Sequence, residues 1–387
     1  MTKENEHLRL YIQKKDMSFS KKLEKTFLTY GVHVLWIPAF VLTCFGLIFV
    51  YSSSSIFALE KFGDQIFFVK KNIVSICLSV CALVFASKFP IQFFIRHVEK
   101  FYASSLFLVL LTLLPVIGKK VGGASRWLNL GIFNIQPVEI LKIFTIILVA
   151  KVFTQKQASL LVFSLSIFVA FLLLLLQPDF GSSFVLGASL ISLFFVYGFK
   201  KRYFAMLACG LIPILTLLIF TKSYRLNRIV SYLDPFSDPL GKGFQTIQSF
   251  IAVANGGFFG KGLGESQQKL FFLPEAHTDF ILAVVSEEVG FIGLLTISIL
   301  YALIFYGIFR LIIFSSDITH KLIACGFFTL IILTTLINMG VVVGIFPTKG
   351  LPLPFISSGG TALIANFFML GLLSQISKKI HENTLSG

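Results

Sequence analysis

The stretch FILAVVSEEVGFIGLLTISILYALIFYGIFR, residues 280–310, decides the fold. Across its whole length the only charged side chains are those of Glu287, Glu288 and Arg310. A helix needs about 20 consecutive, mostly apolar residues to cross the hydrocarbon core of a bilayer. This segment therefore predicts a transmembrane helix.

The composition extends that prediction to the whole chain. Of its 387 residues, 56% are hydrophobic and 13% are charged, and the mean hydropathy is +0.88. Soluble domains carry roughly a quarter charged residues, so a soluble fold is excluded. A transmembrane β-barrel would show short segments of alternating hydropathy, and none is visible. The sequence predicts an all-α polytopic membrane protein.

Similar apolar runs recur along the chain, and we expect about ten spans. They lie near 34–56, 67–87, 101–118, 137–154, 159–176, 180–198, 203–221, 280–310, 321–346 and 361–377. The longest connection between them, residues 222–279, is predicted to be an extracytoplasmic loop. Within it, FQTIQSFIAVA (244–254) has the spacing of a short amphipathic helix lying at the membrane interface.

The basic residues predict the orientation, because cytoplasmic segments are enriched in Lys and Arg. Placing both termini inside puts 19 of the 33 basic residues in inner segments, including seven in residues 1–33. We therefore expect a basic cytoplasmic tail (1–33), a ten-helix membrane domain (34–377) and a short cytoplasmic tail (378–387). The net charge of +15 then reflects topology and attraction to anionic membrane lipids, and the dispersed basic residues argue against a nucleic-acid partner.

Carboxylates are concentrated in LPEAHTDFILAVVSEEVG, residues 273–290, which holds four of the 18 acidic residues. Pro and Glu at its start suit the first turn of a helix, which would place Asp279 one turn inside that helix, near the outer membrane surface. The sequence leaves Asp279 open between a structural and a functional role. Glu287 and Glu288 would lie roughly 12–14 Å deeper, and we interpret them as structural partners that lock helices together.

Two further polar segments belong to the same side of the membrane. GGASRWLNLGIFNIQPVEILK (122–142) contains Arg126 and Trp127, which are either interfacial anchors or part of a site. It also holds Glu139 and Lys142, which share a helix face and could neutralise each other or line a polar site. PTKGLPLPFISSGG (347–360) is an irregular, Pro- and Gly-rich segment that projects Lys349.

These segments together predict a site for an anionic, lipid-linked substrate. The cations Arg126, Lys142 and Lys349 suit a pyrophosphate. A carboxylate beside them can act as a general base toward a hydroxyl or bind a divalent metal.

The motifs ASRWLNLG…QPVEILK, GKGFQTIQS, LPEAHTDF and PTKGLPLPFISSGG resemble, in order, those of the SEDS (shape, elongation, division and sporulation) family of peptidoglycan polymerases. The resemblance covers the chain after about residue 33 and is strongest to the cell-division type. It implies ten transmembrane helices in the bacterial cytoplasmic membrane, at the division septum. It also implies glycosyltransferase activity on lipid II and partnership with a class B penicillin-binding protein and other division proteins.

The resemblance also assigns site residues. The family's essential aspartate falls on Asp279, predicted to be catalytic, and we expect substrate contacts from Arg126, Trp127, Glu139, Lys142, His277 and Lys349. The implied reaction is an inverting transfer, in which an acceptor sugar's 4-hydroxyl attacks C1 of the lipid-linked donor. We assign no fixed cofactor and keep a divalent cation, Mg²⁺ or Mn²⁺, as the one candidate.

The chain departs from the family pattern at two positions: Ser358 replaces a Tyr, and Asn134 replaces a basic residue. The main alternative function is a lipid II flippase, and another is a non-catalytic division scaffold. Transporters often show internal repeats with matching broken helices. No such repeat is visible, which favours the enzyme.

Overall fold

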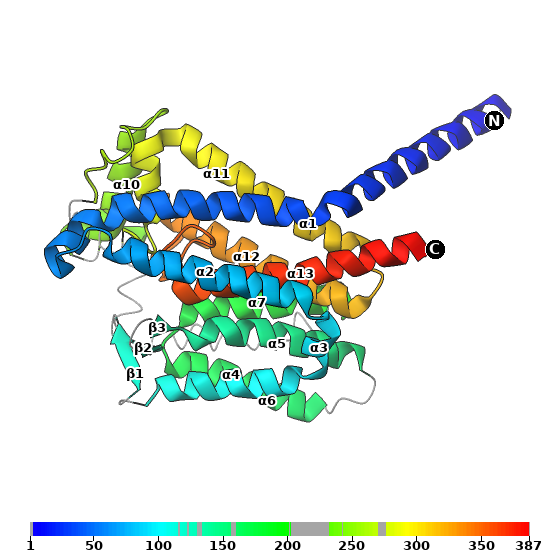
Figure 1. The fold of residues 1–387 in the computed structure, drawn as a ribbon, viewed down its shortest axis with the longest axis horizontal. Coiled ribbons are helices and arrows are strands. Elements are labelled where there is room, and N and C mark those ends of the chain that lie inside the picture. The colour runs from blue at the N-terminus through cyan, green and yellow to red at the C-terminus, as the bar shows by residue number, and fades with distance from the viewer. Residues whose placement is uncertain are drawn as a thin grey trace.

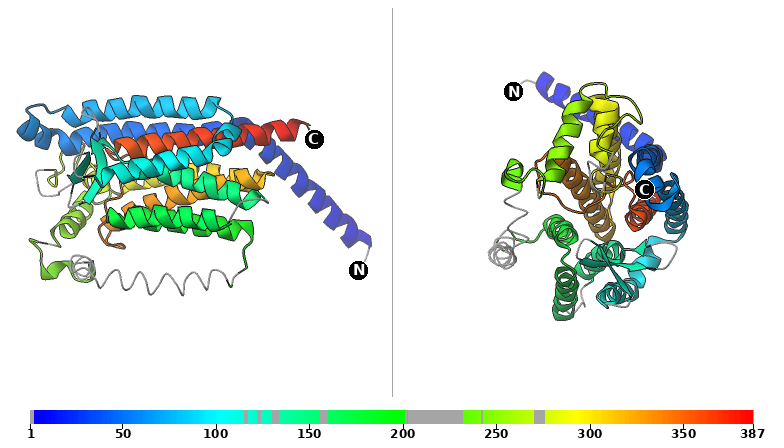
Figure 2. Two further views of the ribbon diagram at one scale, coloured as in Figure 1. Left: turned by 90° about the horizontal axis from the view of Figure 1, so that it is seen from below. Right: turned by 90° about the vertical axis from the view of Figure 1, so that its left-hand side faces the viewer.

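The computed structural model describes residues 3–114, 117–121, 124–129, 134–155, 160–200, 202, 232–241, 243–269 and 276–386. Long helices run side by side along one direction, and both termini lie at the same end of the bundle (Figures 1 and 2). We call the opposite end, which carries a small sheet and the short helix α10, the outer end. A chain that crosses the membrane an even number of times has both termini at the same end.

The helices are α1 (Lys3–Phe62), α2 (Phe67–Lys88), α3 (Ile91–Arg96), α4 (Val98–Thr112), α5 (Pro137–Thr154), α6 (Leu160–Leu176), α7 (Phe180–Tyr197), η1 (Pro235–Ser237), α10 (Phe244–Gly256), α11 (Ile281–Phe314), α12 (Ile318–Val342) and α13 (Gly360–Ser386). Among the described residues, six helices are long and apolar enough to cross a membrane.

The predicted spans coincide with these helices, except 203–221, which lies outside the described residues. Two of the predicted spans, 101–118 and 321–346, extend too far toward the C-terminus, because α4 stops at Thr112 and α12 at Val342. Helix α1 begins at Lys3 and α13 continues to Ser386, so each helix runs through the predicted boundary of its tail, and the cytoplasmic placement of the tails stays a prediction.

A small antiparallel sheet at the outer end was not predicted. Its strands are β1 (Gly118–Val121), β2 (Ala124–Asn129) and β3 (Asn134–Ile135), in the order β1-β2-β3. The register shifts between Lys119 and Lys120. The sheet leads directly into α5, so it fixes where that helix begins.

Helix α5 lies in the middle of the bundle, in contact with α4, α7, α12 and α13 (Figure 1). Its sequence is apolar on all sides, and nearly every residue from Pro137 to Lys151 is buried. Lipid could surround a helix of this composition at the edge of a bundle, but this burial shows that neighbouring helices surround α5. Glu139 and Lys142, in its first turns, are therefore carried into the interior.

Small residues allow neighbouring helices to approach closely. A Cβ atom on Gly371 of α13 would lie 2.6 Å from the Leu83 carbonyl oxygen of α2. On α10 the face that contacts the protein consists of Thr246, Ser249, Ala252 and Gly256. Ile251, an apolar residue of this predicted amphipathic helix, is 39% exposed.

Helix α11 bends at Gly290, whose φ and ψ are 64° and −160° (Figure 1). The backbone of the preceding loop replaces helical hydrogen bonds there. The amides of Phe291 and Ile292 donate to the carbonyl oxygens of Gly257 and Phe258, at 3.0 and 3.3 Å. The segment predicted as one span is thus two helical pieces joined by a loop-supported kink.

Replacing Gly290 by Ala should lower the free energy of unfolding by at least about 1–3 kcal/mol, because almost only Gly adopts this backbone conformation. The new Cβ would also lie 2.4 Å from the Gly260 amide nitrogen. The thermal unfolding temperature of the detergent-purified protein measures the effect. Gly187→Ala is the control, since its Cβ would make an ordinary 3.7 Å contact with Phe171. Equal unfolding temperatures for the two variants would contradict the assignment.

Candidate functional site

Asp279 lies in a turn, residues 276–280, that immediately precedes α11 at the outer end. The prediction that it lies one turn inside the helix is wrong, because the helix begins only at Ile281. The residue is half-buried. Since a turn has no helical hydrogen bonds to fix it, its position must come from other contacts.

Three consecutive carbonyl oxygens of this turn accept hydrogen bonds from residues far away in the sequence. The His277 oxygen accepts from the Ser358 amide at 3.2 Å. The Thr278 oxygen accepts from the Ser357 hydroxyl at 2.6 Å, and the Asp279 oxygen from the Asn338 side-chain amide at 2.8 Å. The backbone that carries Asp279 is therefore held on both α12 and the segment 347–359.

The Asn338 amide also donates to the Leu351 carbonyl oxygen at 2.8 Å, so it joins the turn to that segment. Gly350 lies directly beside the carboxylate: a Cβ there would be 3.3 Å from Asp279 Oδ2. The segment thus forms one wall of the Asp279 site.

Protein surrounds the irregular segment, because non-helical backbone at membrane depth needs cover from protein or from a water-filled cavity. Leu351, Leu353, Phe355 and Ile356 are at most 3% exposed. The Tyr301 hydroxyl donates to the Pro354 carbonyl oxygen, and the Ser357 hydroxyl accepts from the Leu353 amide at 2.8 Å. These contacts make the segment a fixed frame.

Lys349 projects from this frame toward α7. Its Nζ lies 5.1 Å from the centroid of the Phe184 ring, within cation–π range. The residue next to it, Gly350, borders Asp279, so a cation and a carboxylate are carried by two rigidly joined pieces of backbone.

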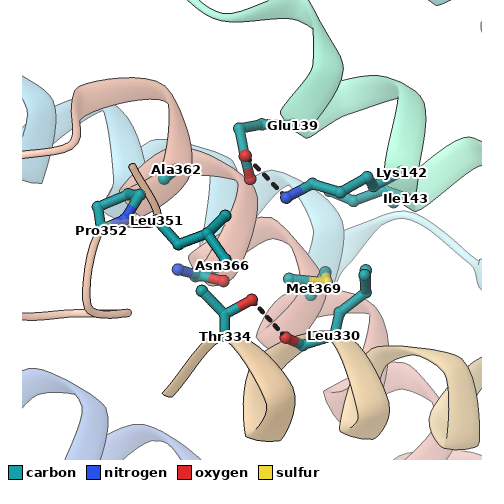
Figure 3. A pocket seen from close by; sticks show the side chains of 10 residues that line it. All are labelled: Glu139, Lys142, Ile143, Leu330, Thr334, Leu351, Pro352, Ala362, Asn366 and Met369. Atoms are coloured by element: carbon teal, nitrogen blue, oxygen red, sulfur yellow. Dashed lines mark hydrogen bonds and ion pairs between the residues drawn. The ribbon is translucent and has the colours of Figure 1, made fainter. Parts of the chain in front are cut away.

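Glu139 and Lys142 form a buried ion pair, with Nζ and Oε1 2.7 Å apart. The pair lines a cavity of about 20 Å³, which holds about one water molecule (Figure 3). Asn366 of α13 and Pro352 of the 347–359 segment face the same cavity. The ion-pair interpretation is correct, and the pair lies across that segment from Asp279.

Arg126 is tied to the turn between α6 and α7. Its Nε and Nη2 atoms donate to the carbonyl oxygens of Gln177 and Pro178, at 3.3 and 2.5 Å. Two of its five N–H groups are thereby used for structure. Trp127 follows it on β2, opposite Lys119 of β1.

His277 packs among aromatic rings at the outer ends of α1 and α2. Its ring centroid lies 4.5 Å from that of Phe68 and 6.2 Å from that of Phe57. Its predicted contact with substrate stays a prediction.

Both departures from the family pattern contribute backbone contacts here. Ser358 donates its amide to His277, as described above. The Asn134 carbonyl oxygen accepts from the Thr361 hydroxyl at 3.4 Å, and the same hydroxyl oxygen accepts from the Gln136 amide at 3.0 Å. Strand β3 is in this way held against the start of α13.

Glu287 and Glu288 are at most 1% exposed and have partners inside the protein, while their structural role stays a prediction. Glu287 accepts from Lys261 at 3.0 Å, from the Ser266 hydroxyl at 2.6 Å and from the Gln268 amide at 3.3 Å. Glu288 accepts from the Ser52 hydroxyl at 2.5 Å. The sequence predicted that both glutamates would lie at the depth of the hydrocarbon core. In the structure the polar loop 257–269 folds over them instead.

The sequence-based interpretation missed the side chains that position the site, chiefly Asn338, Ser357 and Thr361. Asn338 had a detectable signal, because it is the one side-chain amide within the predicted span 321–346. A buried amide has four hydrogen-bonding positions to satisfy, so it needs partners there.

The fold and the site together define a class of protein. It is a multi-pass helical membrane protein with a rigidly held carboxylate and cations at its outer end. A family model described as cell cycle protein, covering FtsW, RodA and SpoVE, matches residues 32–382. The chain therefore belongs to the FtsW/RodA/SpoVE family, and the predicted resemblance is confirmed.

The chain is 40% identical over 354 residues to a probable peptidoglycan glycosyltransferase FtsW of Geobacter metallireducens, covering 90% of this chain and 94% of that one. It is 37% identical over 354 residues to stage V sporulation protein E of Bacillus subtilis, covering 89% and 96%. A structure described as "Structural coordination of polymerization and crosslinking by a peptidoglycan synthase complex" matches with a TM-score of 0.73 and 27% identity, over 89% of this chain and 97% of that one.

Replacing Glu139 by Ala should cost about 3–5 kcal/mol of stability, because it leaves the Lys142 ammonium buried without its carboxylate. The double variant Glu139→Gln/Lys142→Met should recover most of that loss. Thermal unfolding in detergent measures both. Lys70→Ala, which breaks the exposed pair with Asp64, should change the unfolding temperature little. A single variant no less stable than the double variant would contradict the prediction.

Proposed function

We propose that this protein is a peptidoglycan glycosyltransferase that polymerises lipid II into glycan strands during bacterial cell division. The observation that carries the proposal is the Asp279 carboxylate, held on a clamped turn beside the fixed segment that bears Lys349. The names of the similar proteins from Geobacter metallireducens and Bacillus subtilis, and the peptidoglycan synthase structure, support it.

In the proposed reaction, the 4-hydroxyl oxygen of the acceptor sugar forms a bond to C1 of the lipid-linked donor. The bond between C1 and the pyrophosphate oxygen breaks, with inversion at C1, and undecaprenyl pyrophosphate leaves. Asp279 accepts the hydroxyl proton as a general base. Because its backbone is fixed by three hydrogen bonds, the carboxylate does not have to be ordered at the moment of reaction.

The leaving pyrophosphate gains negative charge as the bond breaks, so nearby cations lower the barrier. We assign this role to Lys349, whose segment adjoins Asp279. Arg126 is a second candidate for this role, because the N–H groups of its guanidinium that do not donate to Gln177 and Pro178 can still donate to the phosphate. Glu139, Lys142, Trp127 and His277 are proposed to contact the substrate around this core.

A divalent cation would require more oxygen ligands than Asp279 supplies. Among the described residues, no group of three His, Cys, Asp or Glu side chains could hold a metal. Mg²⁺ often binds one or two carboxylates together with substrate phosphates. The residues present therefore do not fit a metal site made by protein alone, and the proposed proton transfer uses none.

The product strand must be cross-linked, and we propose a class B penicillin-binding protein as the partner. Other division proteins would bring the complex to the septum, within the cytoplasmic membrane. A lipid II flippase is the alternative function, and a non-catalytic scaffold is another. Neither explains why three hydrogen bonds hold the backbone at a half-buried aspartate.

The test is lipid II polymerisation by the protein co-purified with its partner. Asp279→Ala and Asp279→Asn should each lower the rate by at least about 100-fold, the usual contribution of a general base, while the unfolding temperature stays unchanged. Asp234→Asn, which alters an exposed carboxylate of the long outer loop, should retain full activity.

Full polymer yield from well-folded Asp279→Ala would overturn the proposal. Movement of lipid II across vesicle bilayers without polymer formation would favour the flippase. Repeating the polymerisation assay with a chelator tests for a divalent cation. Unchanged polymerisation in the chelator excludes a required divalent ion.

A further inference from the structure

A cavity with no assigned role lies at the end of the bundle that carries the two termini. There α1, α2 and α13 border a wide-open cavity of about 400 Å³. Its lining includes Trp36, Ser87, Ser374, Ser377, Lys378 and His381. It lies at the opposite end from the Asp279 site and is independent of the proposed glycosyltransferase activity.

The floor of the cavity is fixed. The Trp36 indole nitrogen donates to the Ser374 hydroxyl at 2.8 Å, and that hydroxyl donates to the Leu370 carbonyl oxygen at 2.7 Å. Tryptophan and tyrosine are enriched at the level of the lipid headgroups. The cavity therefore has the position expected of a headgroup site.

The carbonyl groups at the end of α2, which would repel an anion, are partly covered. Helix α2 ends at Lys88, and its last carbonyl oxygens carry partial negative charge. The Gln375 side-chain amide donates to the Ser87 carbonyl oxygen. The carbonyl oxygen of the lining residue Ser87 therefore already has a donor.

Positive charge and free donors come from one face of α13, where residues 374, 378 and 381 are spaced as i, i+4 and i+7. Ser377 is 2% exposed, yet in the described part of the chain neither its hydroxyl nor the Lys378 ammonium has a hydrogen-bond or ion-pair partner. The one acidic residue of α13, Glu382, does not line the cavity. Such a site suits a phosphate group.

We propose that this cavity binds the phosphate headgroup of an anionic phospholipid. Lys378 and His381 would meet the phosphate, and the Ser377 hydroxyl would donate to it. The surface of α2 that continues from the cavity is apolar, since Val84, one turn before the lining residue Ser87, is 39% exposed. Acyl chains can lie along that surface, which a free phosphate would not use. Basic pockets between transmembrane helices are known to bind anionic headgroups.

The full chain, purified in detergent, is titrated with short-chain phosphatidylglycerol, with phosphatidylcholine of the same chain length, and with inorganic phosphate. Bound lipid is counted by native mass spectrometry. We expect phosphatidylglycerol to bind at least about fivefold more tightly than phosphatidylcholine, and Lys378→Gln to remove about that factor. Ser377→Ala should also weaken binding. Lys100→Gln, which removes an exposed cation of α4 at the same end of the bundle, should bind as the unaltered protein does.

Three results would overturn the proposal. The first is equal affinity of the unaltered protein for the two lipids, and the second is an equal loss in Lys100→Gln and Lys378→Gln, which would indicate a general charge effect. The third is displacement of phosphatidylglycerol by inorganic phosphate at the same concentration, which would assign the cavity to a free anion.

Discussion

The side-chain amide of Asn338 is the contact on which the outer end of this protein depends. One nitrogen donates to the Asp279 carbonyl oxygen and to the Leu351 carbonyl oxygen, both at 2.8 Å. It thereby joins two irregular segments that are far apart in the sequence and have few hydrogen bonds of their own. Because backbone carbonyls in a buried site need donors, the single amide satisfies two requirements at once. The position of the carboxylate and the shape of the neighbouring frame are set together.

The bundle was largely predictable from sequence, because the lipid environment forces apolar stretches of a minimum length. Span ends near α4 and α12 were less predictable, since apolar residues continue past the last helical turn as far as β1 and the 347–359 segment. The small sheet escaped prediction because β3 has only two residues and β1 four, too short for an alternating pattern.

Within the site, residue chemistry was easier to predict than geometry. The i, i+3 spacing indicated the Glu139–Lys142 pair, and the structure contains it. The neighbours of Arg126 could not be predicted, because its carbonyl partners at Gln177 and Pro178 depend on how α6 packs beside the sheet. The clamp on Asp279 requires Asn338, Ser357 and Ser358 to meet one turn, and only the folded arrangement of α12 and α13 brings them there.

The kink at Gly290 has a consequence for how the outer loop opens. Carbonyl oxygens of Gly257 and Phe258 serve as the helical acceptors for α11, while the backbone oxygens of Glu287 and Glu288 accept from the amides of Lys261 and Gly262, at 2.9 and 3.0 Å. Loop and helix therefore share one set of hydrogen bonds. The loop cannot detach without unwinding a turn of α11, so the amide hydrogens of the two should exchange with solvent as one cooperative unit.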